Sequence, residues 1–510
     1  MDNVRVRFAP SPTGPLHIGG VRTALYTYLI AKKYKGDFIL RIEDTDQNRY
    51  VEGAEDYIIR SLEWCGITPD EGPGFGGDYG PYRQSERKDI YGKYAKQLVE
   101  AGKAYYAFDS AEEISEMRTR LEAEGNRAPK YDHSSRLSMK NSLTLTEKET
   151  ADLLASSDDV IVRLKIEPGE EIVVNDIIRG EVKFNSSELD DKVLLKADGM
   201  PTYHMANIVD DKLMKISHVI RGEEWLPSTA HHVLLYRALG WEETMPKFAH
   251  LSLLLKPNGK GKLSKRDGAK FGFPVFPLEW KAETEEDSFT GFREFGFDPK
   301  ATVNFLAFLG WNPGTEQEIF TIEELAEAFN LDQIVKSGAR FDIDKAKWYN
   351  QQYIINSDNK DIAAYLKVFD AETYEKVSDE YLEEFVGLMK ERVELYGDFY
   401  DSGYYFFEDI KSYEEKMIRK KWKDHRPEKF AKFSEQLSTN KFSSESLKGE
   451  LEAFIKEEEI GYGDIMPFLR LATTGTMQGP DLFQTMELLG KEKSLKRLGE
   501  GLNHFNQVVS

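Results

Sequence analysis

Fourteen residues near the start of the chain, RFAPSPTGPLHIGG from Arg7 to Gly20, have the types and spacing that an anion site needs. An apolar run stops at two prolines, and His17 with a pair of glycines then leads into apolar residues at helical spacing. Backbone N–H groups at a helix start bind anions, and glycine lets a bulky ligand approach the backbone. The competing interpretation is an ordinary turn with a surface histidine. Other stretches of the chain must decide between the two.

Two further stretches place charged residues directly after apolar, strand-like runs. Glu43 heads an acidic cluster after residues 38–42, and Arg221 follows residues 217–220, with Glu224 close behind. Ligands of α/β proteins bind where parallel strands end, so a carboxylate there could hold an ammonium group and an arginine could hold a carboxylate. A solvated acidic loop and a structural ion pair are the competing interpretations.

A glycine-rich basic loop, PNGKGKLSKRDGAK at 257–270, offers several lysines, among them Lys262 and Lys265. A mobile cationic loop of this kind can close onto a polyphosphate and neutralise charge that develops during transfer. A solvated basic loop is the commoner explanation of such a run. The loop alone does not separate the two.

The elements that would position these residues alternate between strand and helix up to about Thr302 and are nearly all helical afterwards. We interpret residues 72–82 as a linker and residues 83–190 as an inserted α+β module. The sequence therefore predicts an α/β catalytic half followed by an all-α half.

Bulk properties narrow the class of protein. A chain of 510 residues is too long for one core and predicts about three to five domains. The net charge of −21 argues against non-specific nucleic-acid binding over the whole surface, but not against local basic patches. The single cysteine, Cys65, excludes an internal disulfide and a cysteine-based zinc site. With no apolar span and no targeting leader, we expect a cytoplasmic protein that does not enter a membrane.

One such basic patch lies in the helical half. Residues 411–432 contain nine Lys or Arg and four Asp or Glu, with Tyr413 and Trp422 among them. Basic residues interleaved with aromatic ones fit contact with a nucleic-acid backbone and unstacked bases. A solvated helix face is the competing interpretation.

Five stretches, taken in order, resemble the bacterial-type glutamyl-tRNA synthetases: RFAPSPTGPLHIGG, RIEDTD, YHMANIVDD, VIRGEEW and KLSKR. HIGG is similar to the HIGH signature of class I synthetases, and KLSKR to their KMSKS signature. The resemblance implies a Rossmann-like class I catalytic domain with an inserted α+β acceptor-binding module, followed by an all-α anticodon-binding region. We expect the catalytic domain at 1–82 and 191–252, the acceptor-stem module at 83–190, a stem-contact region at 253–335 and the anticodon-binding region at 336–510.

The resemblance also implies the reaction. L-Glutamate attacks ATP, with Mg²⁺, to give glutamyl-adenylate and pyrophosphate, and the 3′-terminal adenosine of tRNA(Glu) then takes the glutamyl group. Catalytic roles fall to His17, Lys262 and Lys265, and ATP-binding roles to His17, Gly19, Gly20, Glu224 and Lys265. Glutamate-binding roles fall to Arg7, Ser11, Glu43, Tyr203, Asn207 and Arg221, and tRNA-binding roles to Arg49, Arg419, Lys420 and Lys421.

The sequence departs from the family pattern in two places. Some members carry a cysteine zinc site in the inserted module, but residues 104–110 here contain no cysteine, so we expect no zinc. An aromatic and acidic stretch at about 271–297 looks like an insertion. We expect it to pack against the catalytic or stem-contacting region and to restrain the KLSKR loop.

Several alternatives stay open. A truncated paralogue that glutamylates a tRNA base would lack the helical half, and a glutaminyl enzyme fits RIEDTD and PSPTGPLHIGG less well. A non-catalytic tRNA-binding paralogue would not need the intact signature residues. The sequence does not say whether tRNA(Gln) is charged too, and a monomer is the family expectation.

Overall fold

The computed structural model describes residues 3–438 and 441–509 of the chain. Its described parts form two compact units, one made of Met1–Arg293 with Thr302–Ile343 and the other of Glu294–Ala301 with Asp344–Ser510. No helix among these described residues is long and apolar enough to cross a membrane. The predicted α/β half and helical half correspond to these two units.

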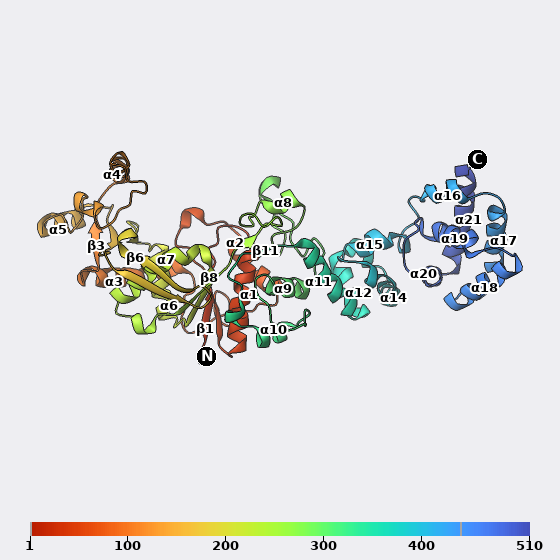
Figure 1. Cartoon of the computed structure of the whole chain (residues 1–510), viewed down its shortest axis with the longest axis horizontal. Helices are drawn as coiled ribbons and strands as arrows, with labels where there is room; N and C mark the ends of the chain where they lie inside the picture. The colour runs from red at the N-terminus through yellow and green to blue at the C-terminus, as the bar shows by residue number, and fades with distance from the viewer. Residues whose placement is uncertain (1–2, 439–440, 510) are drawn as a thin grey trace. The chain divides into compact units, whose positions relative to one another are not determined.

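The first unit is built on a six-stranded sheet in the order β2-β1-β8-β9-β5-β6 (Figure 1). Neighbouring strands are parallel from β2 to β5, and β6 alone is antiparallel to its neighbour. The carboxyl ends of β1, β2 and β8 therefore meet at one edge. The strands are β1 Arg5–Phe8, β2 Asp37–Leu40, β5 Glu171–Asp176, β6 Gly180–Asn185, β8 His218–Gly222 and β9 Lys247–Leu251.

Helices cover this sheet. The long helix α1 contacts β1, β2 and β8, and α7 contacts β5 and α6. The side chain of His17 caps α1 by accepting from the backbone N–H of Gly19. The helices are α1 Ile18–Lys33, α2 Ala54–Trp64, α6 Tyr203–Leu213 and α7 Leu226–Ala238.

The inserted module has a sheet of its own, in the order β3-β4-β7. The predicted boundary at residue 190 is wrong for two strands, because β5 and β6 join the main sheet through a parallel pairing of β5 with β9. Alternating apolar residues identify a strand but not its partner. The module's elements are α3 Lys88–Glu100, β3 Ala104–Ala107, α4 Ala111–Ala123, α5 Glu147–Ser156, β4 Ile161–Leu164 and β7 Val193–Leu195.

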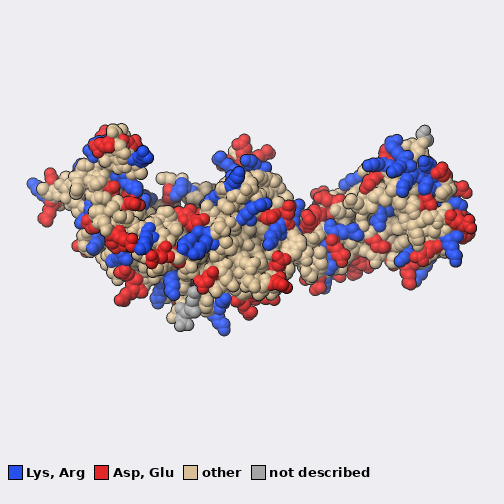
Figure 2. Space-filling view, viewed as in Figure 1, with Lys and Arg blue, Asp and Glu red and all other residues tan. Residues whose placement is uncertain are grey.

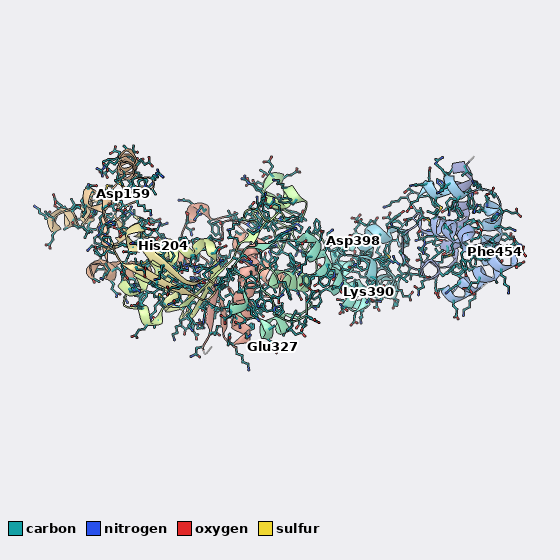
Figure 3. All side chains as sticks on the ribbon, viewed as in Figure 1. Asp159, His204, Glu327, Lys390, Asp398 and Phe454 are labelled. Carbon is teal, nitrogen blue, oxygen red and sulfur yellow. The ribbon has the colours of Figure 1, made fainter. Side chains whose placement is uncertain are left out.

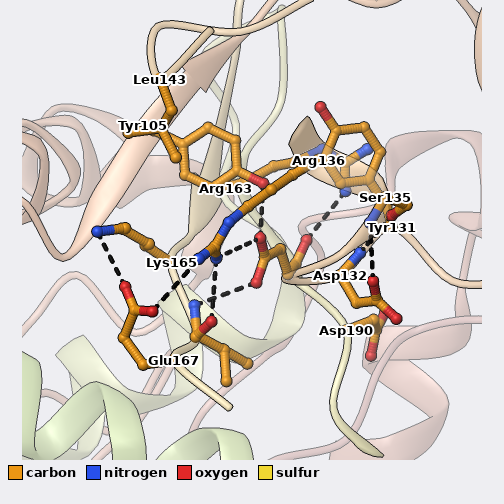
Figure 4. Close-up of polar contacts among 12 residues, drawn as sticks. Tyr105, Tyr131, Asp132, Ser135, Arg136, Leu143, Arg163, Lys165, Glu167 and Asp190 are labelled. Atoms are coloured by element: carbon orange, nitrogen blue, oxygen red, sulfur yellow. Dashed lines mark hydrogen bonds and ion pairs between the residues drawn. The ribbon is translucent and has the colours of Figure 1, made fainter. Parts of the chain in front are cut away.

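A buried polar network centred on Asp191 joins the strands of this module. Figure 4 shows Tyr105, Arg136 and Arg163, which belong to it. Its carboxylate accepts from the Tyr105 hydroxyl at 2.7 Å, from Arg136 at 3.1 Å and from the backbone N–H of Ile166 at 3.1 Å. Arg163 donates to the Asp191 carbonyl at 3.0 Å. Buried polar groups of this kind must be satisfied, so the network fixes one arrangement of the three strands.

The apolar run at 247–255 forms two strands, because β10 Leu254–Leu255 leaves the main sheet after β9 and pairs with β11 Ala339–Arg340. That pairing keeps residues up to Ile343 in the first unit, so the main part of the second unit begins at Asp344 rather than at the predicted 336. The short helices α8 Asp267–Phe271 and α10 Ile322–Ala328 lie in the first unit, and α9 Pro299–Ala307 extends into it.

The stretch after the basic loop is packed, as expected. The Val275 carbonyl accepts from the Ile18 N–H at 3.0 Å, at the first turn of α1. The Tyr57 hydroxyl of α2 donates to the Leu278 carbonyl at 2.5 Å, and Phe276 is fully buried. Residues 271–292 thus lie against the two helices that follow β1 and β2. That they restrain the basic loop stays a prediction.

The second unit is all helical in its described residues and has two apolar clusters. Phe454 belongs to the larger one and lies among the helices (Figure 3). Ile362 and Phe385 belong to the other. The helices are α11 Ile343–Asn356, α12 Asn359–Phe369, α13 Ala371–Tyr374, α14 Asp379–Met389, α15 Asp398–Gly403, α16 Glu415–Lys421, α17 Arg426–Leu437, α18 Ser444–Glu457, α19 Tyr462–Thr474, α20 Leu482–Leu489 and α21 Lys491–Val509.

Candidate active site

A cavity of about 700 Å³ opens where β1, β2 and β8 end, between the start of α1 and the basic loop. Of the described residues that line it, six are basic and two acidic, although the whole chain carries a charge of −21. A cavity with this excess of cations concentrates anionic ligands. The charged residues that line it are Arg7, Arg22, Glu43, Arg49, Arg221, Glu224, Lys262 and Lys265.

The start of α1 differs from the open anion site expected there. Its first N–H, from Ile18, donates to Val275, the N–H of Gly19 donates to His17 Nδ1 at 3.0 Å, and that of Gly20 donates to the His17 carbonyl at 2.7 Å. The first three N–H groups of the helix are therefore already used. Gly20 has a packing role, because a Cβ there would stand 2.5 Å from the Leu16 side chain.

His17 nevertheless presents a donor to the cavity. Its Nδ1 accepts from Gly19, so the proton of the neutral ring lies on Nε2. Burial, assisted by Lys265 and Lys262, lowers the pKa of His17 to about 4 and keeps the ring neutral. The backbone of Ser264 favours the protonated ring and so opposes that shift. Nε2 itself has no hydrogen-bond partner of normal geometry among the described residues. Phe276 packs edge-on against the ring, with centroids 5.9 Å apart.

The two signature lysines of the basic loop differ in their partners. Lys262 Nζ lies 2.6 Å from Glu224 Oε1, and both side chains are exposed. Lys265 makes no ion pair with any residue that the structure describes, and its partial burial lowers its pKa. It approaches the turn after β1 so closely that a Cβ on Gly14, whose φ is +128°, would lie 3.3 Å from Nζ. Lys265 is therefore the cation available to a ligand.

Asp267 holds this loop in shape. Its carboxylate accepts from the Ser264 N–H at 2.8 Å and from the Ser264 hydroxyl at 2.6 Å, and it pairs with Lys256 at 3.0 Å. These partners lower the pKa of Asp267 to about 2, although burial alone would raise it. The carboxylate is charged at neutral pH and anchors the segment between the two lysines.

A buried ionic network lies under the amino-acid end of the cavity. Asp211 accepts from Arg7 at 3.0 and 3.3 Å and from Arg41 at 2.7 Å. Arg41 also donates to Glu43 Oε1 at 3.0 Å, and Asn207 donates to the same oxygen at 3.0 Å. Burial would raise the pKa of Asp211, but the two arginines outweigh it and lower that pKa. Arg7, Glu43 and Asn207 are brought together as predicted, and protein partners already hold them.

Arg221 stands apart from this network. Arg221 is 6% exposed, and its guanidinium contacts only neutral groups among the described residues: Tyr203 Oη at 2.7 Å, Thr229 Oγ1 at 2.8 Å, His250 Nε2 at 3.0 Å, the Trp225 carbonyl at 3.3 Å and His232 Nδ1 at 3.5 Å. Burial lowers the pKa of Arg221, which reports the cost of a charge without a counterion. A buried cation of this kind at a cavity wall favours an anionic ligand.

The remaining predicted residues fall into two groups. Ser11 and Arg49 line the cavity, with Arg49 paired to Asp46 at 2.6 Å. Arg419, Lys420 and Lys421 lie exposed on α16 in the other unit, where Lys and Arg side chains gather (Figure 2).

Trp422 does not offer its ring to a nucleic-acid base. Its side chain is 2% exposed, its ring packs on Phe468 at 4.7 Å, and its Nε1 donates to Asn506 at 2.9 Å. Trp422 directly follows α16 and packs into the apolar cluster, while the basic residues at the end of the helix stay exposed.

Sequence reasoning missed four residues of the site. Arg41 and Asp211 lie within the motifs RIEDTD and YHMANIVDD, which also contain the predicted residues Glu43 and Asn207. The motifs could therefore have indicated them. Asp176 and His250 carried no such signal, because they lie 74 positions apart and meet only through the pairing of β5 with β9.

Comparison with known proteins assigns the family. The profile "tRNA synthetases class I (E and Q), catalytic domain" matches residues 3–348, and the profile "Anticodon binding domain" matches residues 360–502. Together with the parallel sheet, the cavity at its carboxyl edge and the two signature stretches, these matches define the chain as a member of the class I tRNA synthetase family for Glu and Gln.

Within this family the chain belongs with the glutamate–tRNA ligases. It is 53% identical to the ligase of Christiangramia forsetii, which covers 98% of this chain and 99% of that protein, and 53% identical to the ligase of Cytophaga hutchinsonii, with 99% and 98% covered. A glutamate tRNA ligase from Elizabethkingia meningosepticum, solved in complex with its amino acid, superposes with a TM-score of 0.94 at 49% identity, covering 98% of this chain and 99% of that one.

Proposed function

We propose that this site joins L-glutamate to tRNA(Glu) in two steps, with the residue roles argued below. The α-carboxylate of glutamate attacks the α-phosphorus of ATP, the bond to the bridging oxygen breaks, and pyrophosphate leaves with that electron pair. A ribose hydroxyl of the terminal adenosine then attacks the carbonyl carbon of the adenylate, the bond from that carbon to the phosphate oxygen breaks, and AMP leaves with the electron pair while the hydroxyl loses its proton. The cavity, which joins an amino-acid end to a lysine-rich end, is the observation that carries this proposal.

Charge balance supports selection of glutamate over glutamine. In their ordinary charge states, Arg7, Arg41 and Arg221 face Asp211 and Glu43, which leaves the amino-acid end with one positive charge. Glutamate brings a net charge of −1, whereas glutamine brings none. Glutamine would therefore leave one buried charge uncompensated, and rejection of this kind is strong.

Positions within the pocket suggest individual contacts. Arg221 would bind the α-carboxylate, because its charge has no counterion among the described residues. Glu43 would bind the ammonium group, and Arg7 with Tyr203 and Asn207 would bind the side-chain carboxylate. Asn207 Oδ1 is buried without a hydrogen-bond partner in the described parts of the chain, as expected of a group that awaits a ligand. Ser11 would support the substrate at the cavity wall.

At the other end, His17 Nε2 and Lys265 would contact ATP phosphates as charge builds on the leaving pyrophosphate. Lys262 would join them once its pair with Glu224 opens, which would free Glu224 for the ribose. Gly19 and Gly20 would line the nucleotide without donating to it. The described residues include no group of three His, Cys, Asp or Glu that could hold a metal ion, so Mg²⁺ would bind together with ATP and shield its phosphate charge.

The remaining regions would bind the tRNA. The inserted module would contact the acceptor stem, Arg49 the end that enters the cavity, and α16 with Arg419, Lys420 and Lys421 the anticodon arm. We propose a cytoplasmic monomer, in keeping with one buried cysteine and an intact site within a single chain.

The test is ATP–pyrophosphate exchange with and without tRNA, followed by aminoacylation of purified tRNA(Glu) and tRNA(Gln). Exchange that requires glutamate, with charging of tRNA(Glu), is the expected result. Absence of exchange in the presence of tRNA would refute the assignment in favour of a tRNA-binding paralogue. Equal charging of tRNA(Gln) would show that the helical unit does not discriminate between the two tRNAs.

A further inference from the structure

A buried acid and a buried imidazole stand behind Arg221, outside the cavity. His250 Nδ1 lies 2.6 Å from Asp176 Oδ2, and its Nε2 lies 3.0 Å from Arg221 Nε. The side chains of Asp176 and His250 are both 0% exposed. Neither residue lines the cavity, so neither can touch a ligand directly.

The hydrogen-bond partners of His250 fix one tautomer of its ring. A guanidinium only donates, so Nε2 must offer a lone pair to Arg221, and a carboxylate only accepts, so the proton must lie on Nδ1. Burial lowers the pKa of His250, in keeping with a neutral ring. The orientation of the Arg221 fork therefore depends on the proton that Asp176 holds on the far side of the ring.

Asp176 is itself fixed by the backbone. Its Oδ1 accepts from the N–H groups of Ile178 at 3.0 Å and Arg179 at 2.8 Å, and its Oδ2 accepts from the N–H of His250 at 3.1 Å. Asp176 ends β5 and His250 lies in β9, the neighbouring strand. The contacts from Asp176 through His250 to Arg221 form a relay. This relay starts at the edge where the inserted segment returns to the main sheet.

We propose that Asp176 and His250 are positioning residues that set the Arg221 guanidinium for the α-carboxylate of the amino acid. This inference rests on the proposed function, because it takes Arg221 as the α-carboxylate receptor. The other groups on Arg221 are two hydroxyls, a carbonyl and, 3.5 Å from Nη1, the Nδ1 of His232. Of the two imidazole contacts to Arg221, the one from His250 to Nε is the shorter, and its tautomer is set by the Asp176 carboxylate.

Asp176→Asn tests the relay. Its amide oxygen can keep the Ile178 and Arg179 contacts, while its NH₂ group faces His250 Nδ1 and moves the ring proton to Nε2, opposite the Arg221 donor. We expect the KM for glutamate to rise about tenfold or more with the KM for ATP unchanged, and one ¹⁵N-histidine signal to change from the Nδ1–H to the Nε2–H pattern. Asp190→Asn is the matched control, since it alters another acid–imidazole pair, with His231, away from the cavity.

A second pair of variants keeps the test decisive if Asp176→Asn folds poorly. His250→Gln retains an acceptor near the position of Nε2, whereas His250→Leu removes it. We expect the KM for glutamate to stay within about threefold of wild type in the first and to rise about tenfold or more in the second. In a His250→Gln background, Asp176→Asn should have little further effect, because no tautomer remains to be set.

Two results would overturn the relay: equal changes in the KM values for glutamate and ATP, or a changed tautomer with an unchanged KM for glutamate. Both presuppose a wild-type enzyme that exchanges pyrophosphate in the presence of glutamate. If wild type fails in that assay, the proposed function falls instead, so the two failures are distinguishable.

Discussion

Arg7 and Asp211 form a two-pronged buried ion pair, with Nε to Oδ1 at 3.0 Å and Nη2 to Oδ2 at 3.3 Å. The side chain of Arg7 is only 4% exposed and that of Asp211 1% exposed. The orientation of Arg7 is therefore fixed before any substrate arrives. A substitution at Arg7 therefore affects the buried Asp211 as well as the bound amino acid.

Arg7→Lys keeps a charge near Asp211 but loses the planar fork. We expect the KM for glutamate to rise about tenfold to a hundredfold with the KM for ATP unchanged, since a charge-assisted hydrogen bond contributes about 1.5–3 kcal/mol. Steady-state exchange kinetics measure both constants. Arg7→Ala would also leave Asp211 short of one of its two arginines, so it should lower stability as well as activity. Unchanged glutamate kinetics in Arg7→Lys would remove Arg7 from the amino-acid site.

Lys265→Ala removes the lysine that makes no ion pair with a described residue. We expect kcat for adenylate formation to fall about a hundredfold to a thousandfold, because the lost charge acts mainly on the transition state. Lys260→Ala is the matched control from the same loop, since its side chain is exposed and outside the cavity. Single-turnover formation of adenylate measures the effect, and similar rates in the two variants would contradict the assignment.

Phe276→Leu changes the packing behind His17 without altering a charged group. We expect kcat to fall about tenfold to a hundredfold, because a small displacement of a catalytic group is costly. Phe271→Leu, at an exposed ring of the same segment, is the control and should behave as wild type. If Phe276→Leu changes only thermal stability, the segment has a purely structural role.

Lys420 and Lys421 should affect tRNA binding, whereas Trp422 should affect folding. Alanine at both lysines is expected to weaken tRNA affinity about threefold to tenfold at low salt and to flatten its salt dependence. Trp422→Phe should leave affinity unchanged and lower the free energy of unfolding by about 1–2 kcal/mol, since it loses the bond to Asn506. Filter binding and urea denaturation separate the two effects. Loss of tRNA affinity in a fully folded Trp422→Phe variant would instead indicate that the Trp422 ring contacts the tRNA.

Acid should destabilise the protein before its carboxylates titrate. Burial lowers the pKa of His17 and His218 to about 4 and that of His204 to about 3, from 6.5. The unfolded chain therefore binds protons that the folded chain excludes below pH 6.5, and stability falls as pH decreases from 6.5 toward 4. Each group contributes a slope of up to about 1.4 kcal/mol per pH unit.

Urea denaturation between pH 6.5 and 4.5 measures this dependence. His204 lies outside the cavity lining, so His204→Gln should reduce the slope by one histidine's share and leave glutamate kinetics intact. A slope that is the same in wild type and in His204→Gln would show that His204 titrates normally in the folded protein.

The sequence predicted chemistry better than it predicted connectivity. Glu43, Arg221 and Lys265 were found because each follows a strand or occupies a signature loop, and both signals are local. The pairing of β5 with β9 was not predictable, because an alternating run specifies which face is buried but not the neighbouring strand. Asp176 was missed for the same reason, since its partner is set by that pairing.

Two other errors arose from contacts that local spacing does not specify. The N–H groups of α1 were expected to be free, but the Val275 carbonyl arrives from more than 250 positions away. The basic neighbours of Trp422 suggested an exposed ring, but Trp422 directly follows α16 and packs in the apolar cluster of the helical unit. In both cases tertiary packing decided what spacing alone left open.

The neutral surroundings of Arg221 set a rule for small-molecule inhibitors of this pocket. A compound without an anionic group would cover a buried cation and leave it with neither water nor a counterion. A second anion directed at Arg7 should contribute less, since Asp211 already balances that charge. Compounds that mimic the adenylate should therefore keep a polar, negatively polarised group opposite Arg221.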